Sequence, residues 1–251
     1  MTREEQILLR HLKDLADTCF QREYPVFSDF LNLNEQSIFL SLKEEMPAVS
    51  YHFDGGYPFA ERKMVCFVPS GVGYEYPAPL SLLRIRPVQL KFAEELSHRD
   101  YLGTLLGLGI ERSKIGDILV QEDGAFVFCL EGIASYIEEH LDRVRRTSVR
   151  CQREEKASFS YEPRLKRIRG SIASARLDAV ISLAFHTSRS AMVGLIKGEK
   201  VFVNGRVISS ASCLLKENDV ISVRGYGKFI YRGLANQTKK GRYFAEVDVF
   251  V

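Results

Sequence analysis

The C-terminal third of the chain contains RLDAVISLAFHTSRSAMVGLIKGEKVFVNGRVIS at residues 176–209, where the hydrophobic spacing changes from helical to extended. Its first apolar residues share one face of a helix: Leu177, Val180, Ile181 and Ala184. A second set has the same helical spacing: Met192, Leu195 and Ile196. The stretch therefore predicts two short helices that begin close together in the chain, followed by strands.

Both predicted helices have N-terminal signals. Ser174 can cap the first helix and Ser188 the second. A helix N-terminus presents free backbone N–H groups, which here lie beside the Ser188 hydroxyl and the Arg189 guanidinium. Together these groups predict a site for a phosphate, with Lys197 and Lys200 near the other end of the second helix.

A tight hairpin follows the second helix, which Gly198 is suited to end. A strand ending at Val203 leads to Asn204-Gly205, a dipeptide typical of two-residue hairpin turns because both residues tolerate positive φ. Arg206 then begins the returning strand. The turn needs Asn204 and Gly205 whether or not a ligand is bound.

Charge is unevenly distributed along the chain. Residues 1–163 hold 19 Lys and Arg against 26 Asp and Glu, a net charge of −7. Residues 164–251 hold 16 against 6, a net charge of +10. A folded basic module usually binds a polyanion such as nucleic acid, although a basic surface can also serve solubility alone.

The middle of the chain alternates strand and helix patterns. Strands are expected at 82–88, 116–121, 125–131 and 147–152, with Asp123-Gly124 at a hairpin turn. Helical spacing appears around 102–109 and over 133–144. The order βαββαβ predicts a ferredoxin-like plait, the topology of RNA-recognition motifs. The whole chain is thus expected to be α+β.

The plait has an incomplete signature for binding bases. Phe126 and Phe128 lie on its third strand without a leading Lys or Arg, so packing in the core is favoured over base stacking. Arg84 and Arg86 share one face of the first strand, where contact with phosphate or simple solvation are both open.

The N-terminal region predicts a helix over 3–20, a second helix capped by Asn34 and stopped by Pro47, and then a small sheet. The Gly- and Pro-rich residues 70–79 predict a boundary. We therefore expect four segments: a domain of unknown role, the plait, a linker with a basic strand, and the C-terminal module, at 1–76, 77–157, 158–173 and 174–251.

Several classes of protein are disfavoured by the sequence. No run approaches the length of a membrane helix and the N-terminus lacks a secretion pattern, so we expect a cytoplasmic protein without membrane contact. The five cysteines are far apart and the five histidines scattered, which predicts no metal site and no cofactor. His140 is expected to be a core residue, because it falls on an apolar helix face.

The C-terminal residues resemble the S-four-type RNA-binding domain, named for ribosomal small-subunit protein four. The resemblance rests on five elements: Arg176-Leu177-Asp178, Ser188-Arg189, Gly198, Val203-Asn204-Gly205 and Asp219. Glu217-Asn218 departs from the Gly that many members place before the Asp. The resemblance implies an RNA face made of Arg176, Asp178, Ser188, Arg189, Lys197, Lys200, Asn204, Gly205 and Arg206. Asp178 is expected to orient Arg176 or Arg189, or to cap its helix, because a carboxylate repels phosphate.

The order of the three folded parts is similar to that of the YlmH family. This resemblance implies a non-catalytic bacterial protein that binds rRNA and tRNA on the large ribosomal subunit in ribosome-associated quality control, with a link to cell division. A monomer that takes no small-molecule substrate is expected.

The alternative is an RNA-modifying enzyme, similar to a pseudouridine synthase or a methyltransferase, that uses the module for docking. Its active site would lie in residues 1–80, and a deep polar pocket there would favour it. The Gly-rich stretches LGTLLGLG and PSGVG have the wrong spacing or context for a nucleotide loop.

Overall fold

The computed structural model describes residues 2–42, 47–71, 76–156, 159–237 and 241–251. The chain forms two compact units, residues 1–161 and 162–251. Helices and sheets are mixed in it, which confirms the predicted α+β class. The finer limits predicted for the four segments stay a prediction, and the boundary expected at 70–79 falls partly outside the described residues.

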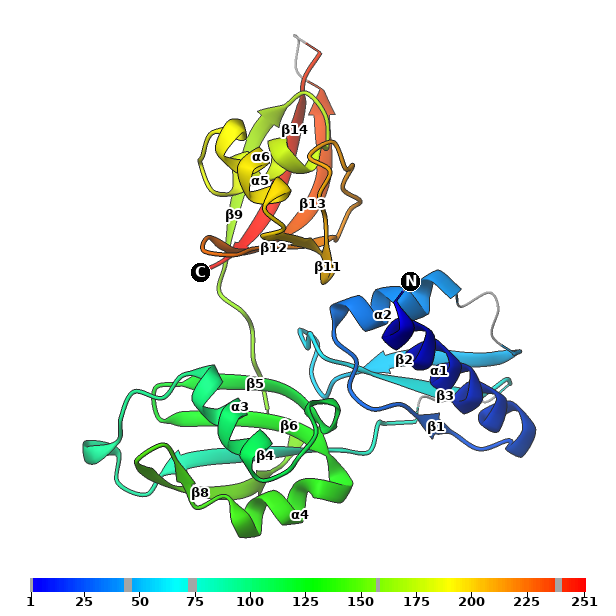
Figure 1. Cartoon of the computed structure of the whole chain (residues 1–251), viewed down its shortest axis with the longest axis vertical. Coiled ribbons are helices and arrows are strands. Elements are labelled where there is room, and N and C mark those ends of the chain that lie inside the picture. Colours follow the sequence, from blue (N-terminus) through cyan, green and yellow to red (C-terminus); the bar gives the residue numbers. More distant parts are fainter. Residues whose placement is uncertain (1, 43–46, 72–75, 157–158, 238–240) are drawn as a thin grey trace. The chain divides into compact units, whose positions relative to one another are not determined.

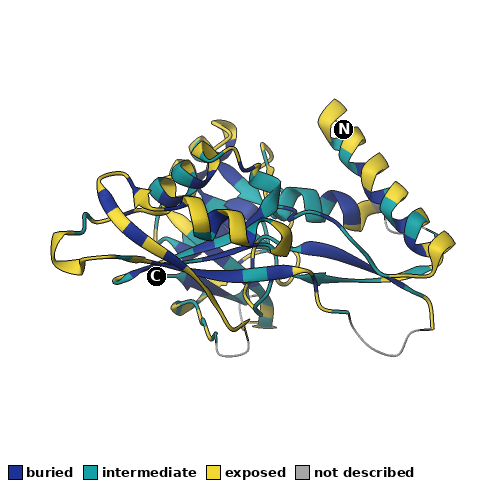
Figure 2. Ribbon diagram, turned by 90° about the horizontal axis from the view of Figure 1, so that it is seen from below, coloured by how far each residue is buried: buried dark blue, intermediate teal, exposed yellow. Residues whose placement is uncertain are grey.

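A helical and β part begins the first unit (Figure 1). Its elements are α1 (Arg3–Arg22), β1 (Val26–Phe27), α2 (Leu33–Leu42), β2 (Val49–Asp54) and β3 (Met64–Pro69). The strands form an antiparallel sheet in the order β1-β3-β2. Helix α1 alternates buried and exposed positions along its length (Figure 2), and its buried residues join the core of this sheet: Leu12, Ala16 and Cys19.

Helix α2 is capped by Asn32 and not by Asn34. The Asn32 side chain accepts a hydrogen bond from the Glu35 N–H at 3.0 Å, and the Glu35 carboxylate accepts one from the Asn32 N–H at 2.6 Å. This reciprocal capping box needs an acidic residue three positions after the cap, which Asn34 lacks because Ser37 stands there. The helix end predicted at Pro47 is not tested, because residues 43–46 before it lie outside the described residues.

The plait completes the first unit. Its elements are β4 (Leu80–Pro87), the 3₁₀ turn η2 (Leu90–Phe92), α3 (His98–Gly107), the 3₁₀ turn η3 (Arg112–Lys114), β5 (Ile115–Gln121), β6 (Gly124–Leu130), α4 (Glu131–His140), β7 (Arg143–Val144) and β8 (Thr147–Glu154). All neighbours in the order β5-β6-β4-β8-β7 are antiparallel, which confirms the ferredoxin-like topology. Helix α4 ends earlier than predicted, because residues 143–144 pair with β8.

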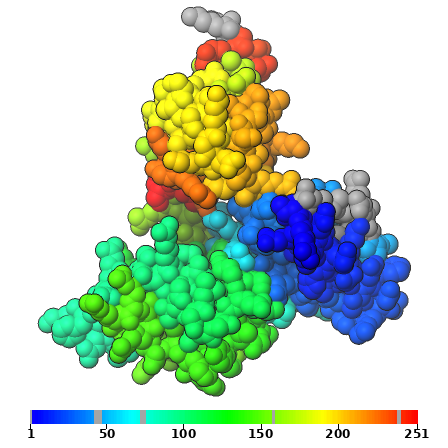
Figure 3. All heavy atoms as spheres, viewed as in Figure 1, coloured from blue at the N-terminus to red at the C-terminus, as the bar shows by residue number. Residues whose placement is uncertain are grey.

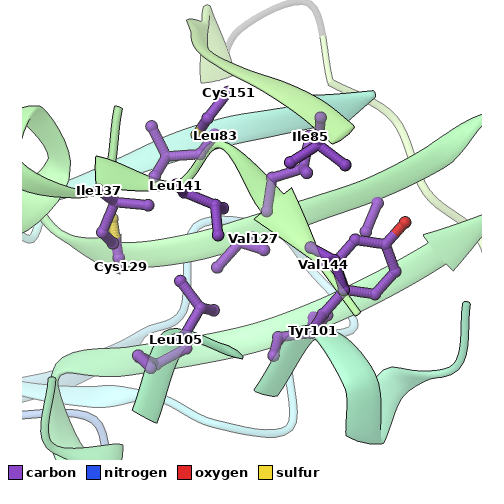
Figure 4. Close-up of a cluster of buried hydrophobic side chains, with 14 of the residues drawn as sticks. Leu83, Ile85, Tyr101, Leu105, Val127, Cys129, Ile137, Leu141, Val144 and Cys151 are labelled. Carbon is purple, nitrogen blue, oxygen red and sulfur yellow. The ribbon is translucent and has the colours of Figure 1, made fainter. Parts of the chain in front are cut away.

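One face of the plait sheet packs against α3 and α4. Figure 4 shows Leu83, Ile85 and Val127 from the sheet meeting Leu105 and Ile137 from the helices. His140 does not join this core. It is exposed at the end of α4 and stacks on Tyr136, with 4.2 Å between ring centroids, so the expectation of a core histidine is wrong. The last turn of α4 rotates His140 away from the buried face.

The opposite face of the plait sheet packs against the N-terminal part of the same unit. Phe128 lies in this core together with Phe30, Met64 and Leu82. Asp117 on β5 adds polar contacts, because its carboxylate accepts hydrogen bonds from the Tyr57 hydroxyl at 2.8 Å and from the backbone N–H groups of residues 61 and 62 at 2.7 and 3.1 Å. Burial raises the pKa of Asp117, although these hydrogen bonds act in the opposite direction.

The second unit is one sheet with two helices on one face (Figure 1). Its elements are β9 (Leu165–Ile172), α5 (Leu177–Ala184), α6 (Arg189–Lys197), β10 (Val201–Val203), β11 (Arg206–Val207), β12 (Val220–Val223), β13 (Gly227–Gln237) and β14 (Tyr243–Phe250). The strand order is β11-β10-β12-β13-β14-β9. The basic strand β9 is therefore an edge of the same sheet as the predicted hairpin.

The helices of the second unit are short and buried on one side. Leu177, Val180 and Ile181 of α5 and Met192 and Ile196 of α6 pack on the sheet. Within the described residues no single helix is long and apolar enough to span a membrane. Helices α5 and α6 reach that length and apolarity only when taken together, and they are bent by 118° at the break between them.

Candidate nucleic-acid interface

Helix α5 begins without the side-chain cap predicted for it. The N-cap residue is Arg176, and Ser174 lies outside the helix. The first N–H groups of the helix instead donate to backbone carbonyls of the loop after β11: Leu177 N–H to Cys213 at 2.8 Å and Asp178 N–H to Ala211 at 3.3 Å. Tertiary contact with this loop therefore supplies the acceptors that a capping serine would offer.

Asp178 lies in the first turn of α5 and joins both arginines of the predicted RNA face. Its carboxylate accepts hydrogen bonds from Arg176 Nε at 3.1 Å and from Arg189 Nη2 at 2.5 Å. It also accepts the Ala179 N–H at 3.0 Å. The Asp178 side chain is only 4% exposed. Asp178 therefore contacts both arginines and one N–H group of its own helix, and its role in orienting the arginines for RNA stays a prediction.

Ionisation of Asp178 is favoured despite its burial. Burial acts to raise the pKa of this carboxyl, but the hydrogen bonds and charges of Arg176 and Arg189 outweigh it, and the pKa lies below its usual value. Asp178 is therefore an anion at neutral pH. One carboxylate against two guanidiniums leaves a net positive charge at this point of the surface.

Ser188 caps α6 as predicted. Its hydroxyl accepts a hydrogen bond from the Ala191 N–H at 3.3 Å, and Arg189 is the first residue of the helix. The Arg189 side chain is 53% exposed. Each guanidinium has five N–H donors, and the bonds to Asp178 occupy only part of them. The remaining donors and the helix N-terminus can bind a phosphate together.

The hairpin turn places residues at the site but offers few N–H donors of its own to a ligand. Asn204 and Gly205 both have positive φ, 49° and 77°, as the predicted turn requires. The Asn204 amide is used inside the protein, because its Nδ2 donates to Asp219 Oδ1 at 2.8 Å and its Oδ1 accepts the Val220 N–H at 2.9 Å. These bonds fix the tip of the hairpin, where Arg206 is exposed.

Outside the hairpin, the other six predicted site residues form two groups. Arg176, Asp178, Ser188 and Arg189 lie together at the start of the two helices. Lys197 ends α6 and Lys200 precedes β10, both exposed. Lys197 lies eight residues after Arg189 on α6, a rise of roughly 12 Å along the helix axis. In the space-filling view the two helices form one continuous surface of the unit (yellow, Figure 3).

The plait offers less to a nucleic acid on the sheet face opposite its helices, because the N-terminal part of the unit packs there. Phe126 is half-buried, between the Arg84 guanidinium at 4.2 Å and Phe159 at 4.9 Å, measured to ring centroids. Arg84 is itself buried and pairs with Asp123, so it is neither solvated nor available to phosphate as the sequence left open. Arg86 remains exposed.

A polar cavity of about 460 Å³ lies in the N-terminal part, where the enzyme alternative would place its active site. His52, Asp54 and Lys63 line it. The Asp54 carboxylate is already bound by the Gly56 N–H at 2.8 Å and the Ala78 N–H at 3.1 Å, so it holds two loops in place. In the described part of the chain no cluster of three or more His, Cys, Asp or Glu side chains could hold a metal ion.

The sequence did not predict one group of charged residues in the second unit, on the face of its sheet opposite α5 and α6. Arg167, Arg232 and Asp248 meet there although they are far apart in the chain. The only signal in the sequence was the alternation of Arg167 and Arg169 in a basic strand.

Two family models match the chain. The one described as "Putative RNA-binding domain in YlmH" covers residues 79–158, and the one described as "S4 domain" covers residues 175–221. These families bind RNA and are not catalytic families. Together with the geometry above, they define an RNA-binding protein in which a plait precedes an S4 domain.

Two known proteins are similar over longer stretches. The "Ribosome-associated protein quality control protein P2" of Bacillus subtilis (strain 168) is 29% identical over 229 residues, 89% of this chain and 87% of that protein. The solved structure of "Cell division protein ylmH from Streptococcus pneumoniae" covers 62% of this chain and 94% of that chain, with 23% identity and a TM-score of 0.50, and it supports the fold alone. The chain is therefore similar to proteins of the YlmH family over most of its length.

Proposed function

We propose that this protein binds rRNA and tRNA on the large ribosomal subunit and acts, without catalysis of its own, in ribosome-associated quality control. One observation supports the RNA site above others: the buried Asp178 holds Arg176 and Arg189 beside the N-terminus of α6. The ribosomal part of the proposal comes from the Bacillus subtilis relative, whose name places it in that process.

The proposed RNA face consists of the residues expected from the sequence, in two roles. Arg176, Ser188, Arg189, Lys197, Lys200 and Arg206 contact the RNA. Asp178, Asn204 and Gly205 position them, because their polar atoms or backbone are occupied within the protein. We further propose that the protein acts in the cytoplasm as a monomer. The cell-division link implied by the family stays a prediction.

Cosedimentation of the full chain with purified large ribosomal subunits tests the proposal. An Arg189→Gln variant removes one charge from the face, and we expect at least a tenfold loss of affinity, about 1.4 kcal/mol. The matched control is Arg10→Gln, which removes one charge from an exposed position of α1. Equal binding of Arg189→Gln and wild type at physiological salt would show that the phosphate site is misplaced.

A further inference from the structure

The sheet of the second unit has a second face, opposite α5 and α6. Residues of β13 and β14 that point toward the helices form the core: Phe229, Tyr231, Ala245, Val247 and Val249. Because side chains alternate along a strand, their neighbours point to the other face. We call this other face the outer face, and its residues include Arg167, Arg169, Lys228, Arg232, Phe244, Glu246, Asp248 and Phe250.

Asp248 organises two arginines on the outer face. Arg167 donates to both of its carboxylate oxygens, from Nε at 2.8 Å and from Nη2 at 3.0 Å. Arg232 donates from Nε at 2.7 Å. The Asp248 side chain is 5% exposed, whereas that of Arg167 is 63% exposed. The carboxylate is therefore covered by the guanidiniums that it holds, and these face solvent.

The backbone is irregular where Arg232 joins this group. The pairing of β13 with β14 shifts between Tyr231 and Gly233, so Arg232 is the extra residue of a β-bulge. Gly233 has a φ of 106°, which a residue with a side chain rarely adopts. Arg232 also donates from Nη1 to Asn218 Oδ1 at 2.8 Å. At this bulge Arg232 therefore joins Asp248 to Asn218.

Cations lie over aromatic rings elsewhere on the outer face. The Arg169 guanidinium is 4.7 Å from the Phe244 ring centroid, and Lys228 Nζ is 4.1 Å from that of Phe250. Arg169 Nε also lies 3.5 Å from Glu246 Oε1, and the Arg169 side chain is 51% exposed. Nucleobases stack on the planes of exposed guanidinium groups. Burial lowers the pKa of Lys228 to about 8, and a phosphate nearby would favour its charged form.

The Asp248 group repeats the arrangement around Asp178. In each case a buried carboxylate binds two arginines, and these bonds use only part of the five N–H donors of each guanidinium. On the outer face the four cations Arg167, Arg169, Lys228 and Arg232 stand against the two carboxylates Glu246 and Asp248. The charge complements an anion, and the cation–ring pairs suit unpaired bases better than an acidic peptide.

We propose that the outer face, through Arg167, Arg169, Lys228 and Arg232, is a second RNA-binding surface that takes single-stranded RNA. It goes beyond the proposed function, which places ribosomal RNA and tRNA on the helical face. The protein would then hold two RNA segments at once, one on each side of a single sheet.

The test uses the full chain and a fluorescent 12-nucleotide oligouridine, with binding followed by anisotropy. The outer-face variant is Arg169→Gln with Arg167→Gln, and Arg169→Gln alone serves as a variant that leaves the Asp248 bonds intact. The helical-face variant is Arg176→Gln with Arg189→Gln. We expect the outer-face double variant to lose at least tenfold in oligouridine affinity and the single variant at least threefold. Cosedimentation with large subunits should change less than twofold in both.

Each other outcome has a defined meaning. Wild-type oligouridine affinity in the outer-face variants overturns the proposal, as does loss of oligouridine binding only in the helical-face variant. Equal competition by oligouridine and by poly-glutamate would also overturn it, because the face would then take any polyanion. If the helical-face variant still sediments with large subunits while the outer-face variants lose oligouridine, the proposed function fails and this inference stands.

Discussion

Arg189 and Asp178 are 11 residues apart in the chain, yet Arg189 Nη2 lies 2.5 Å from Asp178 Oδ2 and joins the start of α6 to the start of α5. The bond does two things at once. It satisfies a carboxylate that is almost fully buried, and it fixes a guanidinium at a helix N-terminus. Substitutions at either end therefore affect both the fold and the RNA face, and they can be designed to separate the two.

The first prediction concerns Asp178→Asn. The variant gains one unit of positive charge, so simple electrostatics predicts tighter RNA binding. We expect the opposite, a loss of about five- to tenfold, because Arg176 and Arg189 lose the carboxylate that orients them. The measurement is affinity for large ribosomal subunits. Glu199→Gln, which removes an exposed charge nearby, is the control and should bind slightly better than wild type. Equal gains in both variants would refute an orienting role.

The second prediction concerns Arg189→Glu. From the sequence alone this change suits a first helical turn, where acidic residues are favourable. The structure shows that it would place a carboxylate against the buried Asp178. We expect a loss of about 1–3 kcal/mol in unfolding free energy, roughly 5–15 °C in Tm. Thermal scanning checks this against Lys200→Glu, an exposed change of equal charge. Equal Tm values for the two variants would contradict it.

The sequence predicted local features well. The order of the plait elements, the Ser188 cap and the Asn204-Gly205 turn are all confirmed, because periodicity and turn chemistry depend on residues close in the chain. The predicted N-caps of α2 and α5 were wrong, because other residues supply the hydrogen bonds at the start of these helices. At α2 the partner Glu35 selected Asn32, and at α5 a loop more than 30 residues away replaced Ser174.

Long-range pairing limited what could be predicted of the sites. A contact of Asp178 with Arg189 was one of the alternatives expected from the sequence, since both lie in one short motif. Arg167 and Asp248 are 81 residues apart and meet only because β9 pairs with β14 at the edge of the sheet. No local pattern specifies which strands pair, so the outer face could not be foreseen. The RNA contacts proposed for the site residues stay predictions.

The third prediction is that the stability of the protein depends on pH through the ionisation of Asp248. Hydrogen bonds from Arg167 and Arg232 lower the pKa of Asp248 to about 2, against about 3.9 in an unfolded chain. They outweigh burial, which acts to raise the pKa. A depressed pKa in the folded state gives stability that is complete above pH 4 and is lost as the pH falls through 2. The Tm difference between wild type and Asp248→Asn should therefore be constant from pH 5 to 7 and shrink below pH 4. A difference independent of pH down to 2 would show that the pKa of Asp248 is the same in the folded and the unfolded protein, and that the bonds from Arg167 and Arg232 do not favour its ionised form.

The last prediction is that a fragment of residues 162–251 retains most of the RNA affinity and shows strong salt dependence. The fragment is a compact unit with its own hydrophobic core, and residues 164–251 within it carry a net charge of +10. Each phosphate neutralised by a cation contributes about 0.7–0.9 to the slope of log affinity against log salt. The five cations of the proposed RNA face, Arg176, Arg189, Lys197, Lys200 and Arg206, therefore predict a slope of roughly −3.5 to −4.5. Affinity for large ribosomal subunits should then fall about 100- to 500-fold between 50 and 200 mM salt. The matched fragment is residues 1–161, whose sequence is acidic overall and which contains the plait. If that fragment binds as tightly as 162–251, the plait carries the main contact and the charge asymmetry has no role in binding. If 162–251 binds tightly but with a slope near zero, its affinity does not come from phosphate contacts, and the assignment of the two helices as the RNA face is wrong.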